Sequence, residues 1–186
     1  MKKNKGIYRV WSIPQDKNRK MHTPLTAAAE AKMKVLDLLD NFATRCEPSG
    51  MPRLMWCRHP YEFESLDNQI ILRTEMYNAV RTIHMDRSTP PNGEAHSRLE
   101  YSVGCWEGET LVVNTSLLNW DYYDTRGIPQ SEAAEVVERY TISQNRSRLG
   151  YFITTTDIET LTEPATIKGH WRALGESIKP YNYEVF

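Results

Sequence analysis

The sequence predicts a mainly β protein: an antiparallel barrel of about eight to ten strands with one N-terminal flanking helix. Three observations predict this class. Short segments rich in β-branched and aromatic residues recur along the second two-thirds of the chain, with turn residues between them. Several of these segments are joined by hairpin-like turns. Only one stretch has helical spacing. Closure of such a sheet into a barrel removes its exposed edges.

The clearest hairpin is centred on Glu107-Gly108-Glu109. Gly108 can adopt the positive φ that a short hairpin loop requires. If residues 99–106 alternate between two faces, Tyr101 and Trp106 point in opposite directions. Only one of the two can then face the interior, unless a bulge near Gly104 changes the register.

The N-terminal part supplies a first strand, expected at residues 6–13, and the helix. We expect the helix at about residues 24–39, because Thr23 suits the N-cap and Pro24 suits the first helical position. Apolar residues then recur at helical spacing. The helix is expected to lie across the sheet or the mouth of the barrel.

The other strands follow from alternation and turn signals, and no repeat or domain boundary interrupts them, so residues 1–186 are expected to form a single domain. They are expected at residues 53–56, 61–65, 69–75, 79–85, 99–106, 110–116, 134–143, 148–157, 165–172 and 181–185.

Composition excludes several function classes. The net charge is -1, so the chain has no overall basic character that would indicate nucleic-acid binding. No apolar run approaches the roughly 20 residues of a membrane helix. No apolar segment of a signal peptide follows Lys2-Lys3-Asn4-Lys5. The expected location is therefore the periplasm if an export signal has been removed, and otherwise the cytoplasm.

Cysteine and histidine spacing gives no metal or cofactor motif. Cys46, Cys57 and Cys105 contain no C-x-x-C pair, and the histidines are widely spaced. Nucleotide-binding glycine motifs are absent as well, so neither a metal nor a cofactor is expected. The sequence is compatible with two states of the three cysteines: one disulfide with one free thiol, or three buried thiols.

Polar groups recur on the apolar faces of the predicted strands. Glu138 shares a face with Tyr140, and Asp157 shares one with Tyr151. A small barrel that buries such groups has to pair them, because an unpaired buried charge is costly. The outcome is either a structural ion-pair network or a polar cavity that shifts carboxylate pKa values, and the sequence leaves both open.

Two sets of candidate site residues follow. A carboxylate beside a phenol suits proton transfer, and an aspartate can orient a histidine as a general base. The catalytic candidates are Glu138, Tyr140, Tyr101, His84 and Asp157. Arginines can hold an anionic group, and an aromatic loop at about residues 120–124 can cap a pocket. The ligand-binding candidates are Arg73, Glu75, Arg81, Trp106, Trp120, Tyr122, Tyr123, Tyr151 and Trp171.

Five segments, at residues 45–53, 60–64, 103–115, 131–133 and 138–140, carry a family resemblance. With them the chain resembles a family of bacterial hypothetical proteins that are usually exported. The resemblance implies a lipocalin-like (calycin-type) barrel and a periplasmic setting, and it assigns no catalytic residue. Tyr101 stands where the family has a histidine. The family's C-terminal cysteine has no counterpart here, so Cys46 lacks its presumed disulfide partner unless Cys57 or Cys105 replaces it.

Three functions are compatible with these features. The leading hypothesis is a cofactor-independent acid/base enzyme, an isomerase, cyclase or lyase, that acts on a small organic molecule in a central cavity. The alternative is a non-catalytic periplasmic carrier of a small hydrophobic or aromatic ligand. A third is a protein-interaction barrel that uses the aromatic loop at residues 122–123. The chain is expected to be a monomer or a homodimer.

Overall fold

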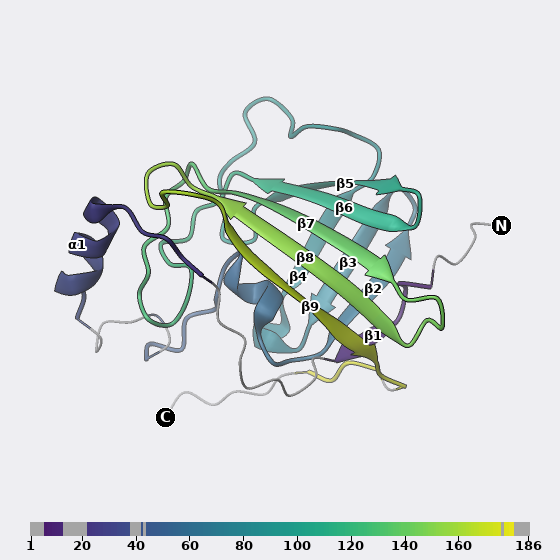
Figure 1. Cartoon of the computed structure of the whole chain (residues 1–186). Coiled ribbons are helices and arrows are strands. Elements are labelled where there is room, and N and C mark those ends of the chain that lie inside the picture. Colours follow the sequence, from purple (N-terminus) through teal and green to yellow (C-terminus); the bar gives the residue numbers. More distant parts are fainter. Residues whose placement is uncertain (1–5, 13–21, 38–41, 43, 176, 181–186) are drawn as a thin grey trace.

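The computed structural model describes residues 6–12, 22–37, 42, 44–175 and 177–180. These residues form a closed barrel of nine strands in which each strand pairs with its neighbours in chain order, and β9 pairs with β1 (Figure 1). One helix flanks the barrel. The predicted fold class, a lipocalin-like β-barrel with a flanking helix, is confirmed.

The strand bounds follow the predicted segments closely from β2 onward. The strands are β1 (Val10–Ser12), β2 (Tyr61–Leu66), β3 (Gln69–Thr74), β4 (Val80–His84), β5 (Tyr101–Glu107), β6 (Thr110–Ser116), β7 (Glu135–Ile142), β8 (Arg148–Thr156) and β9 (Ala165–Ala173). The strand expected at residues 181–185 lies outside the described residues.

One pair of strands corrects the prediction of an antiparallel barrel. β4 and β5 are parallel, with Ile83 opposite Ser102 and His84 opposite Val103. Residues 85–100 carry the chain back to the end of the barrel where β4 began. β5 therefore runs in the same direction as β4, and residues 85–100 form a crossover connection rather than a hairpin turn. The other eight pairs are antiparallel.

Residues 53–56 were expected to be a strand and instead form a 3₁₀-helix, η2 (Arg53–Trp56). Pro52 precedes it with helical angles, φ −82° and ψ −5°. Leu54 and Met55 are both buried, although they are adjacent, and a half-buried strand would bury only alternate residues. A second 3₁₀ turn, η3 (Met76–Asn78), joins β3 to β4.

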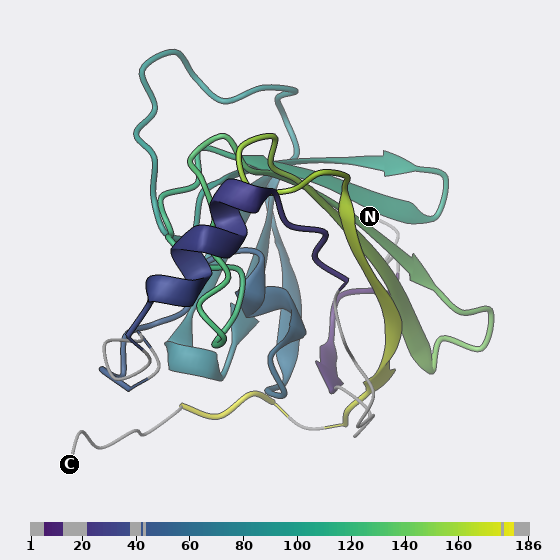
Figure 2. The ribbon, with the colours of Figure 1, turned by 60° about the vertical axis from the view of Figure 1, so that its left-hand side comes forward.

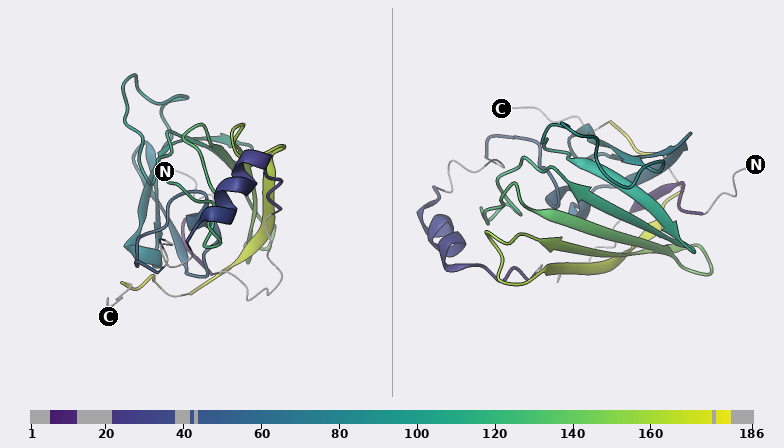
Figure 3. Two further views of the ribbon diagram at one scale, coloured as in Figure 1. Left: turned by 90° about the vertical axis from the view of Figure 1, so that its left-hand side faces the viewer. Right: turned by 90° about the horizontal axis from the view of Figure 1, so that it is seen from above.

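The helix α1 (Ala27–Val35) is shorter than the predicted range of about 24–39. Its N-cap is Thr26 rather than Thr23, because the Thr26 hydroxyl accepts the backbone N–H of Ala29 at 3.2 Å. Ala29 is also the residue of α1 that is buried. The helix lies across one end of the barrel, which Figures 2 and 3 show from the side and end on. This position agrees with the predicted place at the barrel mouth.

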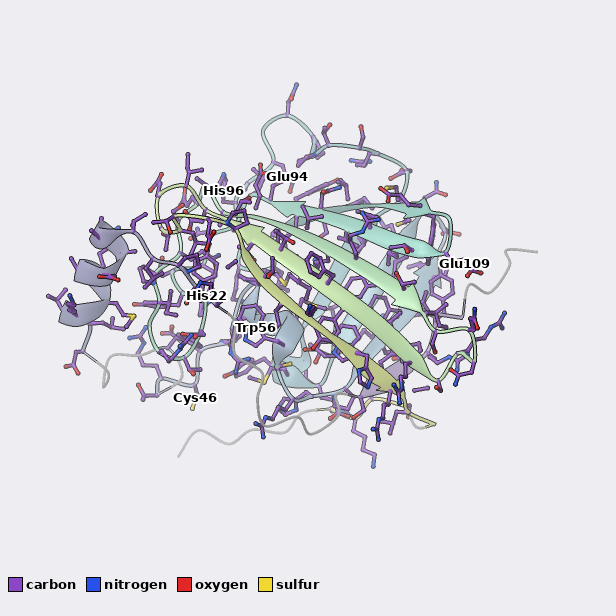
Figure 4. The ribbon with its side chains drawn as sticks, in the orientation of Figure 1. His22, Cys46, Trp56, Glu94, His96 and Glu109 are labelled. Carbon is purple, nitrogen blue, oxygen red and sulfur yellow. The ribbon has the colours of Figure 1, made fainter. Side chains whose placement is uncertain are left out.

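The two ends of the barrel differ. At the helix end lie α1, η2 and the loops at residues 117–134 and 157–164. At the hairpin end lie the β2–β3, β5–β6 and β7–β8 turns. Figure 4 shows Glu109 at the hairpin end, with His22, Trp56 and His96 toward the helix end.

Aromatic rings fill the middle of the barrel. The Trp171 ring stacks on Tyr61 with centroids 4.5 Å apart and lies 5.1 Å from the Tyr151 ring and 5.5 Å from the Tyr140 ring. Trp11 is fully buried, and its indole N–H donates to the carbonyl of Ile7 at 2.8 Å. No helix among the described residues combines the length and apolar character needed to cross a membrane.

Candidate functional site

The centre of the candidate site is an arginine inside the barrel. Alternation along β4 turns Arg81 and Ile83 inward, and both are buried. The Arg81 guanidinium donates two hydrogen bonds to Glu138 on β7, from Nη1 to Oε1 at 3.1 Å and from Nη2 to Oε2 at 2.8 Å. Both side chains are essentially inaccessible to solvent. This two-pronged contact is the geometry of a guanidinium–carboxylate pair.

Neighbouring strands complete the polar cluster around Arg81. Its Nη2 also donates to the hydroxyl of Ser102 on β5 at 2.8 Å and to that of Thr115 on β6 at 3.1 Å. Ser102 and Thr115 face each other in the β5–β6 register, so both point inward from adjacent strands. The Tyr140 hydroxyl donates to Glu138 Oε1 at 2.6 Å. Four strands thus converge on one buried ion pair.

Glu100 adds a second carboxyl group to this cluster. Its Oε1 lies 2.7 Å from Arg81 Nε, but the Nε–H does not point along this contact, so the two groups are in close contact without a hydrogen bond. Oε1 also accepts the Ser102 hydroxyl at 3.1 Å. Oε2 is buried and has no hydrogen-bond partner among the described residues.

The backbone of Glu100 is strained. Its φ is +66°, in the left-handed region that non-glycine residues rarely adopt. The residue stands directly before β5 and turns its carboxyl group into the barrel beside Arg81. Strained residues of this kind persist only where the surrounding structure holds them, and they are common at functional sites.

Burial determines the electrostatics of the cluster. Burial raises the pKa of Glu100, Arg81 lowers it and Glu138 raises it further, and the net value is about 8. Burial alone would lower the pKa of Arg81, but Glu138 and Glu100 outweigh it and raise that pKa, so the guanidinium stays charged. Burial and Glu138 also raise the pKa of Tyr140 well above its usual value. At neutral pH, Glu100 is therefore an uncharged acid beside a cation.

Two predicted catalytic residues lie outside the barrel. The His84 and Tyr101 rings stack on the outward face of the sheet, where Tyr101 is itself covered, with centroids 4.6 Å apart and an interplanar angle of 5°. The Tyr101 hydroxyl accepts a hydrogen bond from Arg87 at 3.1 Å. The β5–β6 register is continuous, so no bulge reverses the faces, and Trp106 packs against the core instead. Tyr101 and His84 therefore cannot exchange protons with a ligand in the interior.

Asp157 holds two loops together at the helix end. Its carboxylate accepts the Ser131 N–H at 2.8 Å, the Ser131 hydroxyl at 2.7 Å and the Tyr123 hydroxyl at 3.0 Å. It also accepts the N–H groups of Glu159 and Thr160. Burial would raise the pKa of Asp157, but these hydrogen bonds outweigh it and lower that pKa. Both oxygens of the Asp157 carboxylate therefore accept hydrogen bonds that hold the loops together.

The predicted ligand-binding residues fall into three places. Arg73 and Glu75 lie outside: Arg73 Nη2 is 3.4 Å from Glu64, and a Glu75 carboxylate oxygen accepts the N–H of Lys179 at 2.8 Å. Trp120 and Tyr122 pack on the ring of Phe42 at the helix end. The interior or its edge holds Arg81, Trp106, Tyr123, Tyr151 and Trp171.

The sequence predicts Arg81, Glu138 and Tyr140 as site residues, whereas Glu100, Ser102 and Thr115 are not among its candidates. One signal could have found two of them. Glu100 and Ser102 share the face of Trp106 in an alternating strand, so an inward Trp106 brings both inward. The left-handed conformation of Glu100, directly before β5, has no signal in the sequence.

Neither a metal centre nor a disulfide forms in the described part of the chain. No three His, Cys, Asp or Glu side chains converge there to hold a metal ion. Cys46, Cys57 and Cys105 are all free thiols. Cys57 is buried, with its sulfur 3.0 Å from the Tyr61 hydroxyl.

Two hollows lined by described residues lie on the outer surface. One, of about 230 Å³, lies between the β3–β4 connection and residues 178–180. The other, of about 600 Å³, lies over β7, β8 and β9. The central cavity stays a prediction. No protein-family model matches the chain, and no curated protein matches its sequence.

Proposed function

We propose that this barrel binds a small organic molecule at the buried cluster of Arg81, Glu100 and Glu138 and acts on it as a cofactor-independent acid/base enzyme. The observation that carries the proposal is the Glu100 carboxyl group. It is fully buried, its pKa is about 8, and its Oε2 has no hydrogen-bond partner among the described residues. A neutral buried acid of this kind can donate a proton to a ligand oxygen.

The other members of the cluster have supporting roles. Arg81 is engaged by Glu138, Ser102 and Thr115, so it fixes the site and stabilises negative charge that develops beside it. Glu138 accepts hydrogen bonds from Arg81 and Tyr140. A neutral carbonyl compound with an apolar body fits this arrangement better than an anion, because Glu138 already neutralises Arg81. Isomerisation, cyclisation and elimination are the matching reaction classes.

One observation favours the second candidate, a non-catalytic carrier. The interior beside the polar cluster is aromatic, with Trp171 in contact with Tyr61, Phe63 and Tyr151. Aromatic side chains of this kind can pack against a small aromatic ligand whether or not a reaction follows. In a carrier, Glu100 would orient the ligand by a hydrogen bond and transfer no proton.

The first test is the titration of Glu100 itself. Carbon-detected NMR of protein labelled at the glutamate side-chain carboxyls should show one carboxyl that titrates near pH 8, and Glu100→Gln should remove that signal. Glu64→Gln is the matched control, because Glu64 is an exposed carboxylate on the outer face. A Glu100 signal that titrates near its ordinary value would overturn the proposed role.

The second test separates enzyme from carrier. Acetophenone serves as a neutral aromatic ketone probe, and NMR in D₂O follows both its binding and the exchange of its methyl protons. An enzyme should accelerate exchange, and Glu100→Gln should abolish the acceleration while Tyr101→Phe keeps it. Binding without exchange contradicts the enzyme and supports the carrier. Absence of binding contradicts both.

A further inference from the structure

The outer surface of β7, β8 and β9, which faces the viewer in Figure 1, carries an open hollow of about 600 Å³. It is separate from the interior cluster: Tyr151 and Gly169 border it although they belong to the inward face, and the other residues around it lie on the outer face. Its lining includes Arg139, Thr141, Gly150, Phe152, Lys168 and His170.

Strand register explains why the surface is hollow at this point. Gly150 lies between Thr141 on β7 and His170 on β9, in the middle of a three-strand row. The next row is Arg139, Phe152 and Lys168. Because Gly150 has no side chain, the centre of the first row is open, and its neighbours on both sides form the walls.

The backbone does not require glycine at this position. Gly150 is not among the residues with positive φ. A Cβ added there would approach no atom closer than the Thr141 carbonyl oxygen at 3.4 Å, which is ordinary contact. Glycine in a strand is unfavourable compared with almost any other residue. The fold alone therefore does not explain why a glycine, and with it an open space, occurs at position 150.

Positive charge surrounds the hollow. Arg139 and Lys168 lie on one side, and Arg148 lies directly opposite Arg172 on the other side. Like charges in directly opposite positions destabilise a strand pair. Arg139 is paired with Glu107 at 2.6 Å, whereas no ion pair is seen for Arg148, Lys168 or Arg172 within the described residues. Glu107 belongs to β5, and the one carboxylate that β7, β8 and β9 themselves carry on their outer face is that of Glu135, at the helix end of β7.

An aromatic ring lies among these positively charged side chains. Phe152 is 43% exposed, between Arg139 and Lys168 in the central strand. A half-exposed ring offers a flat apolar surface for stacking, and the surrounding cations favour an anionic ligand. These two properties together describe an aromatic molecule with a negative group.

We propose that this hollow binds a small planar aromatic anion, with its ring against Phe152 and its phosphate or carboxylate over Gly150 among Lys168, Arg148 and Arg172. The site does not depend on the proposed chemistry of the interior. Binding relieves the repulsion between Arg148 and Arg172, which have no counter-charge in the described part of the chain.

The test uses 1-naphthyl phosphate as the probe and backbone amide shifts in NMR titration as the readout. We expect shifts centred on Gly150, Phe152 and Gly169, and weaker binding at higher salt. The neutral 1-naphthol and inorganic phosphate alone should each bind more weakly than 1-naphthyl phosphate. Glu100→Gln should leave the affinity unchanged, which separates this site from the interior.

Variants make the proposal falsifiable. Gly150→Val fills the hollow and favours the strand, so it should weaken binding at least roughly tenfold without lowering the thermal unfolding midpoint. Lys168→Glu should weaken binding by a similar factor. Gly150→Ala, a smaller change, should give an intermediate affinity. An affinity in all three variants that equals that of the wild type would overturn the proposal. So would shifts centred on the interior, or absence of binding.

Discussion

Arg81 and Glu138 lie 57 residues apart in the sequence and meet through two hydrogen bonds, at 3.1 and 2.8 Å, inside the barrel. The pair joins β4 to β7 across the interior, since these strands are not neighbours in the sheet. A buried ion pair of this kind adds little net stability over an apolar packing, because both charges are desolvated. Loss of one partner, however, leaves the other charge buried and unpaired.

The first prediction concerns this pair. Glu138→Gln should lower the free energy of unfolding by at most about 3–5 kcal/mol, because Arg81 loses its two-pronged partner and Glu100, whose pKa Glu138 no longer raises, replaces it only in part. The double variant Arg81→Met/Glu138→Leu removes both charges and should recover most of this loss. Urea unfolding of the two variants and the wild type measures the difference. A double variant that is less stable than Glu138→Gln would contradict the interpretation.

The second prediction concerns pH and Glu100. Its pKa is about 8 in the folded protein, above the value of 4.5 that is usual for the side chain. Between these values the unfolded chain releases the proton while the folded chain retains it. Stability from this group is therefore fully present below pH 4.5 and is lost as pH rises toward 8.

Comparison with Glu100→Gln isolates this contribution, because the other titrating groups are common to both proteins. Between pH 5 and pH 8, wild type should lose up to roughly 4 kcal/mol of unfolding free energy relative to Glu100→Gln, and the difference should level off above that range. Urea unfolding at a series of pH values measures it. A difference that does not change with pH would show that Glu100 titrates normally.

Local pattern was sufficient to predict much of the barrel. Alternation alone placed Glu138 and Tyr140 on one face, and they are hydrogen-bonded inside the barrel at 2.6 Å. Alternation alone does not determine which face of β5 points inward. Tyr101 is therefore among the predicted catalytic residues, although it lies outside the barrel. That choice depends on long-range pairing of β4 with β5, which no local signal specifies.

The errors at other elements have similar causes. Residues 53–56 have the composition of a strand, but the preceding Pro52 starts a 3₁₀ turn whose adjacent apolar side chains are both buried. Thr23 and Pro24 have the composition of a helix start, yet the cap is Thr26, whose backbone N–H also donates to the carbonyl of Thr160 at 2.9 Å. In both cases, tertiary contacts decided between two acceptable local patterns.

The third prediction contrasts two glycines on neighbouring strands. A Cβ at Gly169 would approach the Tyr151 hydroxyl oxygen to 2.2 Å, whereas a Cβ at Gly150 meets only ordinary contacts. Gly169→Ala should therefore lower the unfolding free energy by about 1–3 kcal/mol. Gly150→Ala should leave it unchanged or raise it by up to about 0.5–1 kcal/mol.

Thermal unfolding of both alanine variants measures this contrast. The double variant Gly169→Ala/Tyr151→Phe should recover part of the loss, because it removes the oxygen that lies closest to the added methyl group. Equal stability of Gly169→Ala and Gly150→Ala would show that the Tyr151 ring can move aside without cost.

The fourth prediction concerns Asp157, which holds Ser131 and Tyr123 at the helix end. Asp157→Asn should cost about 1.5–3 kcal/mol, because an amide has one oxygen acceptor fewer and leaves buried donors unpaired. The pKa of Asp157 is lowered in the folded protein, so its stabilisation is present above its usual value of 3.8 and is lost as pH falls below it. Urea unfolding of the variant and wild type at pH 7 and pH 3 tests both statements. The variant's deficit should shrink at pH 3, and a constant deficit would contradict the assignment.

The pairing of β1 with β9 has a consequence for synthesis of the protein. Trp11 pairs with Ala173, so β1 completes the sheet with β9, which is translated after the other eight strands. Until then the nascent sheet has two open edges, and Trp171, which stacks on Tyr61, is missing from the interior. The barrel therefore closes only after β9 has been translated, and β1, with three residues, has β2 as its single strand neighbour until then.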